Sequence, residues 1–124
     1  MRIKGEISLP GDKSISHRSL MFASLTDGEC VIHNISTGED VETTQKCLAQ
    51  CGIISLKDGS TIRIKGSNFI NPNLPLDCRN SGTTIRLLAG LLAGQGVMAE
   101  YTGDESLAKR PMGRIIDPLS EMGV

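Results

Sequence analysis

The stretch 82–94, GTTIRLLAGLLAG, constrains the fold more than any other part of this 124-residue chain. Its apolar residues fall on nearly every side of a helix, and Asn80 or Ser81 just before it is a suitable N-cap. A helix that is apolar all round needs neighbours on several sides. We therefore expect 82–94 to be a buried helix with other elements packed around it.

The other segments predict short strands and helices in alternation. Before the buried helix we expect a strand at 2–9, a helix at about 14–25 capped by Asp12, a strand at 30–35, a helix from Asp40 to Cys51, and a hairpin of 53–57 with 61–65. After it we expect a strand at 97–102 and a helix from Pro111, which is either kinked or starts later because Pro118 lies inside it. This order predicts an α/β fold with helices packed on mixed sheets, built from two successive βαβαββ units of which the second is cut short.

Composition excludes several classes of function. The chain is 39% apolar and 22% charged, as a folded globular protein is, and its net charge of −1 predicts no general affinity for nucleic acid or acidic membranes. The only aromatic residues are Phe22, Phe69 and Tyr101, too few for a base-stacking surface. No apolar run reaches membrane-spanning length and the N-terminus lacks a signal-peptide core, so we expect a cytoplasmic protein.

The cysteines and histidines do not have the spacing of a metal site. Cys47 and Cys51 lie one helical turn apart and are interpreted as part of a core stripe rather than as ligands. His17 and His33 have no partner at metal-ligand spacing. We therefore predict no metal.

Basic residues gather at three expected helix starts. In PGDKSISHRSL (10–20) a turn leads to Lys13 and Ser14 at a helix N-terminus, with Arg18 one turn after Ser14 on the same face. Backbone N–H groups at such an end bind anions, and a guanidinium binds a carboxylate in a fork. The same residues also fit a solvated basic helix start.

The two other helix starts follow the same pattern. In DCRNSGTTIRLL (77–88) Gly82 in the first turn lets a ligand approach the backbone, and Arg86 follows one turn later. In DESLAKRPMGR (104–114) Arg110 lies just before the helix expected at Pro111. An ordinary cap and a solvated surface remain the alternatives for these two stretches. Together the three basic helix starts predict a site for a small substrate with several negative charges.

These stretches, in this order and spacing, resemble the 5-enolpyruvylshikimate-3-phosphate synthase family of 3-phosphoshikimate 1-carboxyvinyltransferases. The resemblance extends over essentially the whole chain through LPGDKSISHRSLMFASLTDGE, GEDVETTQKCLAQCGI, NSGTTIRLLAGLLAG and KRPMGRIIDPLSEMG. The related enzyme that uses UDP-N-acetylglucosamine has a reactive cysteine where this chain has Glu105, which speaks against that alternative. A stand-alone anion-binding module derived from such a segment is the other alternative.

The resemblance implies roles for particular residues. Lys13, Ser14 and Arg18 would contact 3-phosphoshikimate, with Lys13 shared between both substrates and therefore the one residue here with a catalytic contact. The phosphoenolpyruvate site, which glyphosate also occupies in this family, would include Lys13, Gly82, Arg110 and, less directly, Asn80. Arg86 would have a supporting role.

The implied reaction transfers the carboxyvinyl group of phosphoenolpyruvate to the 5-hydroxyl of 3-phosphoshikimate and releases phosphate, in aromatic amino-acid biosynthesis. Because phosphate departs intact, no cofactor or metal is expected. The resemblance implies a monomer whose partners are these two small substrates.

The chain is several-fold shorter than the family enzyme. The resemblance implies that 1–12 are a strand and turn of a domain otherwise built from the C-terminal half, and that 13–124 are the first and part of the second βαβαββ unit of the other domain. The ending DPLSEMGV, in which a helix stop precedes Val124, suggests a truncation. The acid–base groups of the reaction would lie beyond Val124, so we expect these residues alone to be inactive.

Overall fold

The computed structural model describes residues 1–124 in full. Helices and strands follow one another as α1 (Lys13–Ser24), β1 (Glu29–Ile32), α2 (Glu39–Gln50), β2 (Ser55–Asp58), β3 (Thr61–Lys65), β4 (Leu76–Asp77), α3 (Gly82–Gly94), β5 (Tyr101–Thr102), α4 (Glu105–Ala108) and α5 (Gly113–Glu121).

The strands form two separate sheets. In the three-stranded sheet, β3 lies between β1 and β2 and is antiparallel to both. The second sheet is a parallel pair, β4 with β5, and α3 connects these two strands as the helix of a βαβ unit. Antiparallel and parallel pairings therefore occur in different sheets rather than within one mixed sheet.

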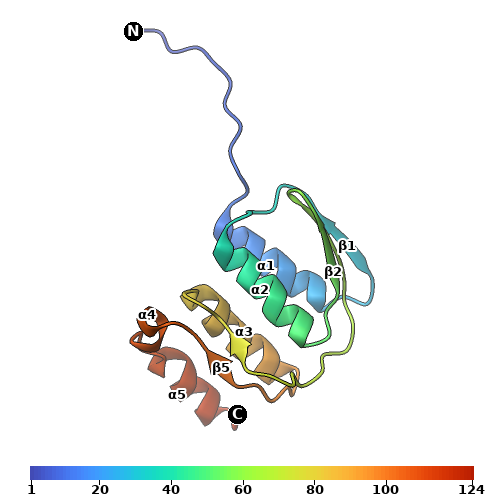
Figure 1. The fold of residues 1–124 in the computed structure, drawn as a ribbon, viewed down its shortest axis with the longest axis vertical. Helices are drawn as coiled ribbons and strands as arrows, with labels where there is room; N and C mark the ends of the chain where they lie inside the picture. The colour runs from blue at the N-terminus through green and yellow to red at the C-terminus, as the bar shows by residue number, and fades with distance from the viewer.

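The elements are arranged in layers (Figure 1). The helices α1 and α2 pack against each other, and α1 also packs on β1 and β3 of the three-stranded sheet. Beyond α2 lies α3, and α5 packs on α3 further from that sheet. The α/β architecture predicted from the sequence is confirmed.

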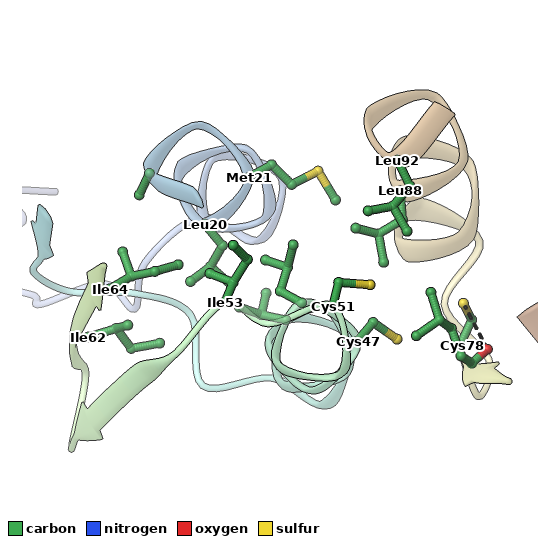
Figure 2. Packing of buried hydrophobic residues seen from close by; sticks show 14 of the residues in the cluster. Leu20, Met21, Cys47, Cys51, Ile53, Ile62, Ile64, Cys78, Leu88 and Leu92 are labelled. Atoms are coloured by element: carbon green, nitrogen blue, oxygen red, sulfur yellow. Dashed lines mark hydrogen bonds between the residues drawn. The ribbon is translucent and has the colours of Figure 1, made fainter. Parts of the chain in front are cut away.

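One hydrophobic core connects these layers (Figure 2). Leu20 of α1 packs with Ile53 and Ile62 near the three-stranded sheet, and Leu88 of α3 is buried on the other side of α2. Cys47 of α2 and Cys51, which follows the last residue of α2, join the two regions and are 1% and 0% exposed. Their expected place in a core stripe is confirmed. Burial raises the pKa of the Cys51 thiol to about 11, so this side chain behaves as a small apolar group.

Local sequence signals explain where the helices begin and end. The Asp12 carboxylate accepts the Ile15 N–H at 2.7 Å and caps α1. Ser81, rather than Asn80, caps α3 by accepting the Thr84 N–H at 3.1 Å. Gly52, which follows the end of α2, has a φ of +90°, the left-handed conformation expected at that position.

The expected hairpin is formed, with β3 at its predicted bounds and β2 at Ser55–Asp58 rather than 53–57. Gly59 and Ser60 form the turn between β2 and β3, with Gly59 at a φ of +58°. A glycine at the first central position matches the right-handed twist of the two strands.

The expected strand at 2–9 is not formed. Residues 1–12 contain no helix or strand, and they extend away from the body of the molecule (Figure 1). Ile3, Ile7 and Leu9 are 71–86% exposed because no neighbouring strand offers them hydrogen bonds or apolar contacts.

The helix 82–94 forms as predicted, but the prediction that it is buried on all sides is wrong for this chain. In α3 one stripe that includes Leu88 and Leu92 is buried, whereas Leu87 is 41% exposed. The neighbours α2 and α5 cover parts of its surface and leave the rest open.

Two further expectations near the C-terminal end need correction. The strand expected at 97–102 shrinks to Tyr101–Thr102 because β4 offers only two residues for pairing, and the Met98 N–H bonds the Asn71 side chain instead. The last helix starts at Gly113 rather than Pro111, with Pro118 inside it. A later start was one of the two alternatives that Pro118 left open.

Candidate functional site

The N-termini of α1, α2 and α3 meet at one end of the helical layer. Lys13 at the start of α1 places its Nζ 3.0 Å from Asp40 Oδ2, in the first turn of α2. The Asp40 carbonyl in turn accepts a hydrogen bond from Thr84 Oγ1, in the first turn of α3. The three helices begin on the same side of the molecule (Figure 1). Their N–H groups and the positive ends of their dipoles therefore lie close together, as an anion site requires.

Two guanidinium groups lie directly over Gly82. A Cβ placed on Gly82 would come within 2.6 Å of Arg86 Nη1 and 2.9 Å of Arg110 Nη1. These separations are shorter than real Cβ atoms show, so any side chain at this position would push the ends of the two arginine side chains aside. Gly82 thus allows two cations to approach the N-terminus of α3.

Hydrogen bonds to neighbouring protein groups fix the positions of the two arginine side chains. Arg86 Nη2 donates to the Pro111 carbonyl at 3.2 Å, and Arg110 Nη2 donates to Asn80 Oδ1 at 3.0 Å. Asn80 Nδ2 donates to both carboxylate oxygens of Asp104, at 3.0 and 3.2 Å. Asn80 therefore connects Arg110 to a carboxylate without a direct ion pair.

The Asp104 carboxylate that bonds Asn80 is itself held by the start of α4. Its carboxylate caps α4 by accepting the Leu107 N–H at 2.8 Å. That backbone hydrogen bond, followed by the one from Asn80, lowers the pKa of Asp104 below its usual value. The carboxylate stays ionised and keeps the Asn80 amide turned so that its oxygen faces Arg110.

The site contains guanidinium groups that make no direct ion pair, although Asp104 lies near enough to Arg110 for the two charges to interact. Ion pairs engage Lys13 with Asp40, Lys46 with Glu42, Arg63 with Glu29 and Arg79 with Glu39. Arg18, Arg86 and Arg110 form no ion pair. Two of these unpaired guanidiniums are the ones over Gly82, so this end of α3 has a local excess of positive charge.

The predicted site residues fall into two groups. The structure brings Gly82, Asn80 and Arg110 into one cluster and connects Lys13 to it through Asp40. Ser14 and Arg18 lie exposed on α1 beside Lys13 and make no hydrogen bond to the cluster. The six residues thus form an arginine cluster at α3 and an exposed polar face on α1.

Sequence reasoning missed part of this arrangement. It gave Arg86 a supporting role only, although Arg86 Nη1 is the atom nearest to the Gly82 position. The spacing of four residues between Gly82 and Arg86, one helical turn, was the available signal. Asp104 and Asp40 were not assigned to the site, because their distance in sequence from Asn80 and Lys13 hides the contacts.

The structure gives no sign of a metal centre or a membrane span. Histidine, cysteine and acidic side chains form no group of three or more that could hold a metal ion. None of the helices combines the length and the apolar character needed to cross a bilayer.

Comparison with known proteins shows the family of this chain. A model of the family described as EPSP synthase (3-phosphoshikimate 1-carboxyvinyltransferase) matches residues 1–124. The chain belongs to the EPSP synthase family. A curated 3-phosphoshikimate 1-carboxyvinyltransferase from Synechococcus sp. (strain JA-3-3Ab) is 48% identical over 126 residues, which cover 98% of this chain and 28% of that protein. One from Streptococcus gordonii is 47% identical over 125 residues, which cover 98% of this chain and 29% of that protein.

Solved structures of the EPSP synthase family share the fold. An EPSP synthase from Acinetobacter baumannii superimposes with a TM-score of 0.90 at 38% identity, over 96% of this chain and 28% of that one. The chain therefore spans less than a third of the length of the relatives that it matches. The fold class and the family membership expected from the sequence are both confirmed.

Proposed function

We propose that this chain supplies part of both substrate sites of a 3-phosphoshikimate 1-carboxyvinyltransferase. The reaction transfers the carboxyvinyl group of phosphoenolpyruvate to the 5-hydroxyl of 3-phosphoshikimate and releases phosphate. The observation that carries the proposal is the approach of Arg86 and Arg110, both without a carboxylate partner, to Gly82 at the start of α3.

Phosphoenolpyruvate fits the arginine cluster by charge. It carries a phosphate and a carboxylate, and guanidinium forks together with a helix N-terminus bind such groups through charge-assisted hydrogen bonds. Arg110 and Gly82 are the proposed contacts, Asn80 orients Arg110, and Lys13 completes this site. No step of the binding requires a metal or a cofactor.

The exposed face of α1 is the proposed contact for 3-phosphoshikimate. Lys13, Ser14 and Arg18 point away from the core, and Arg18 has no protein partner for its guanidinium. A carboxylate on Arg18 and a hydroxyl or phosphate near Ser14 would use these free donors. Lys13 belongs to the α1 face, pairs with Asp40 of α2 and would serve both substrates.

We further propose that the relatives' two-domain organisation accounts for residues 1–12. The exposed Ile3, Ile7 and Leu9 fit a strand that pairs within the other domain, while 13–124 form one unit and part of a second in their own domain. The order β4, α3, β5, α5 fits the first part of such a second unit. The complete enzyme would be a cytoplasmic monomer that acts on small substrates.

A substitution of Arg110 tests the proposed function. Residues 1–124 would be joined to the remaining length of the Synechococcus relative, and the release of phosphate would be measured. We expect Arg110→Ala to raise KM for phosphoenolpyruvate by roughly 10- to 100-fold, as loss of a charge-assisted hydrogen bond does, and to change KM for 3-phosphoshikimate much less.

Arg114→Ala is the matched control, since Arg114 is an arginine of α5 that is not among the atoms close to Gly82. Its KM values should stay within about twofold of the unsubstituted protein. Equal losses for both substrates in Arg110→Ala, or equal effects of the two substitutions, would contradict the proposed role. The 124-residue chain without the added length should show no turnover.

A further inference from the structure

Four buried polar side chains form a continuous network across α1, α2 and α3. His17 Nδ1 lies 2.7 Å from Thr44 Oγ1, which lies 2.8 Å from Thr84 Oγ1, which lies 2.7 Å from Ser81 Oγ. These four side chains are at most 1% exposed. We call them the buried hydroxyl network. Polar groups at such depth are costly unless each is satisfied, so the network has a defined set of donors and acceptors.

The position of the His17 proton follows from its unpartnered Nε2. Nε2 is buried and has no hydrogen-bond partner, whereas Nδ1 lies beside the Thr44 hydroxyl. A buried N–H without an acceptor is rarer in proteins than an acceptor without a donor, so we infer that the proton is on Nδ1 and is donated to Thr44. Thr44 then donates to Thr84 Oγ1, whose own single proton goes to Ser81 Oγ or to the Asp40 carbonyl.

The two ends of the network lie at the two groups of proposed site residues. His17 is one turn after Lys13 on α1 and directly precedes Arg18. Ser81 caps α3 and directly precedes Gly82, over which Arg86 and Arg110 lie. The network is therefore a short, dry connection between the α1 face and the N-terminus of α3.

We propose that neutral His17 is a positioning residue that sets the spacing between the α1 face and the N-terminus of α3 through Thr44, Thr84 and Ser81. This inference rests on the proposed function. His17 itself touches no substrate in this proposal. It holds the two halves of the site at the separation at which both substrates bind together, so the binding of one favours the binding of the other.

The surroundings of His17 keep it in the neutral form. Burial lowers its pKa below the ordinary value of 6.5, because a charged ring with an unpaired Nε2–H would sit in a dry environment. The charged groups that act on it are Asp40 on α2, which opposes this shift, and Lys13 on α1, which adds to it. The neighbours that α3 contributes to the network, Ser81 and Thr84, do not titrate.

The tautomer can be measured without any substrate or substitution. Long-range nitrogen–proton NMR spectra of the histidine-labelled 124-residue chain distinguish a protonated Nδ1 from a protonated Nε2. At pH 7 we expect His17 to be protonated at Nδ1 only. A proton on Nε2, or a charged ring at this pH, would overturn the proposal.

Two substitutions of His17 test the positioning role. In His17→Asn the amide nitrogen lies close to the position of Nδ1 and can donate to Thr44, whereas in His17→Gln it reaches the position of Nε2 instead. Binding of phosphoenolpyruvate to the joined protein described above would be measured by titration calorimetry, with and without 3-phosphoshikimate. We expect His17→Asn to keep the gain in affinity that 3-phosphoshikimate causes within about twofold, and His17→Gln to reduce it about tenfold.

A second pair of substitutions guards against misfolding of the histidine variants. Thr84→Ser keeps the hydroxyl and should preserve the gain in phosphoenolpyruvate affinity that 3-phosphoshikimate causes. Thr84→Val keeps the shape of the side chain without the hydroxyl and should lose this gain. Equal gains within each pair would overturn the positioning role but leave the proposed function intact. If phosphoenolpyruvate failed to bind the unsubstituted joined protein, the proposed function would fall and this role with it.

Discussion

At the scale of single residues, the absence of a side chain at Gly82 decides how two cations are placed. The guanidinium groups of Arg86 and Arg110 would normally repel each other and extend into solvent. Here the Pro111 carbonyl and the Asn80 side chain each fix one of them, and Gly82 leaves the space that both require. The two positive charges repel each other at this separation. An anionic ligand bound beside them would offset that repulsion.

Replacing Gly82 tests this arrangement. In Gly82→Ala the new methyl group would displace Arg86 Nη1 and Arg110 Nη1, which lie 2.6 and 2.9 Å from its position. We expect phosphoenolpyruvate and glyphosate to bind about tenfold more weakly, equivalent to about 1.4 kcal/mol. Titration calorimetry of the joined protein described above would measure both affinities.

Gly90→Ala provides the control within the same helix. A methyl group there meets no atom within 4 Å and should raise helix stability by about 0.5–1 kcal/mol without changing affinity. Unchanged glyphosate binding in Gly82→Ala would show that the arginines do not line that site.

At the scale of elements, the start of α1 shows how a cap controls both stability and the site. Asp12 accepts the Ile15 N–H through its side chain, and its carbonyl accepts the Ser16 hydroxyl at 2.6 Å. Ser16 Oγ then accepts the Ser36 N–H at 2.9 Å, which ties the loop before α2 to the start of α1. The cap therefore fixes the turn that carries Lys13.

Removal of this cap should destabilise the chain measurably. We expect Asp12→Ala to lower the free energy of unfolding by about 1 kcal/mol, the usual loss for an N-cap. Asp12→Asn keeps a side-chain oxygen at the cap and should lose only a few tenths of a kcal/mol. Urea unfolding followed by circular dichroism would compare the two, and equal losses would contradict a capping role.

Local signals predicted most helices because a cap and a terminator are properties of neighbouring residues. Asp12 marks the start of α1, Ser81 that of α3, and Gly52 follows the end of α2. The strands were predicted less well. β4 carries no local signal, and β5 is limited to two residues by the length of β4, which lies some twenty-five residues away. Strand length depends on the partner strand, and a single segment contains no information about its partner.

At the scale of the whole molecule, apolar surface remains open at two places. Ile3, Ile7 and Leu9 extend from the body, and a groove of about 290 Å³ between α3 and α5 is lined by side chains that include Ile85, Ile115 and Leu119. Both places are consistent with the chain spanning less than a third of its relatives' length.

Deletion of residues 2–9 tests whether this segment contributes to the fold of the rest. It has no strand partner, so we expect the free energy of unfolding to change by less than about 0.5 kcal/mol. Deletion through Asp12 should be more damaging, because it also removes the cap of α1 and Gly11, which lies against the Asn34 carbonyl. Thermal unfolding of the two shortened chains would separate these effects, and a large loss from the shorter deletion would argue for a hidden partner of 2–9.

The amino-acid sequence by itself determined the helices α1, α2 and α3, the hairpin of β2 and β3, and the residue types of an anion site, because caps, terminators and periodic apolar residues act over a few positions. Only the tertiary structure decided which of those residues meet. It brought Arg86 and Arg110 to Gly82, joined Lys13 to Asp40, and linked His17 to Ser81 across three helices. Such contacts join residues far apart in sequence, and they depend on the packing of α1, α2 and α3 against one another.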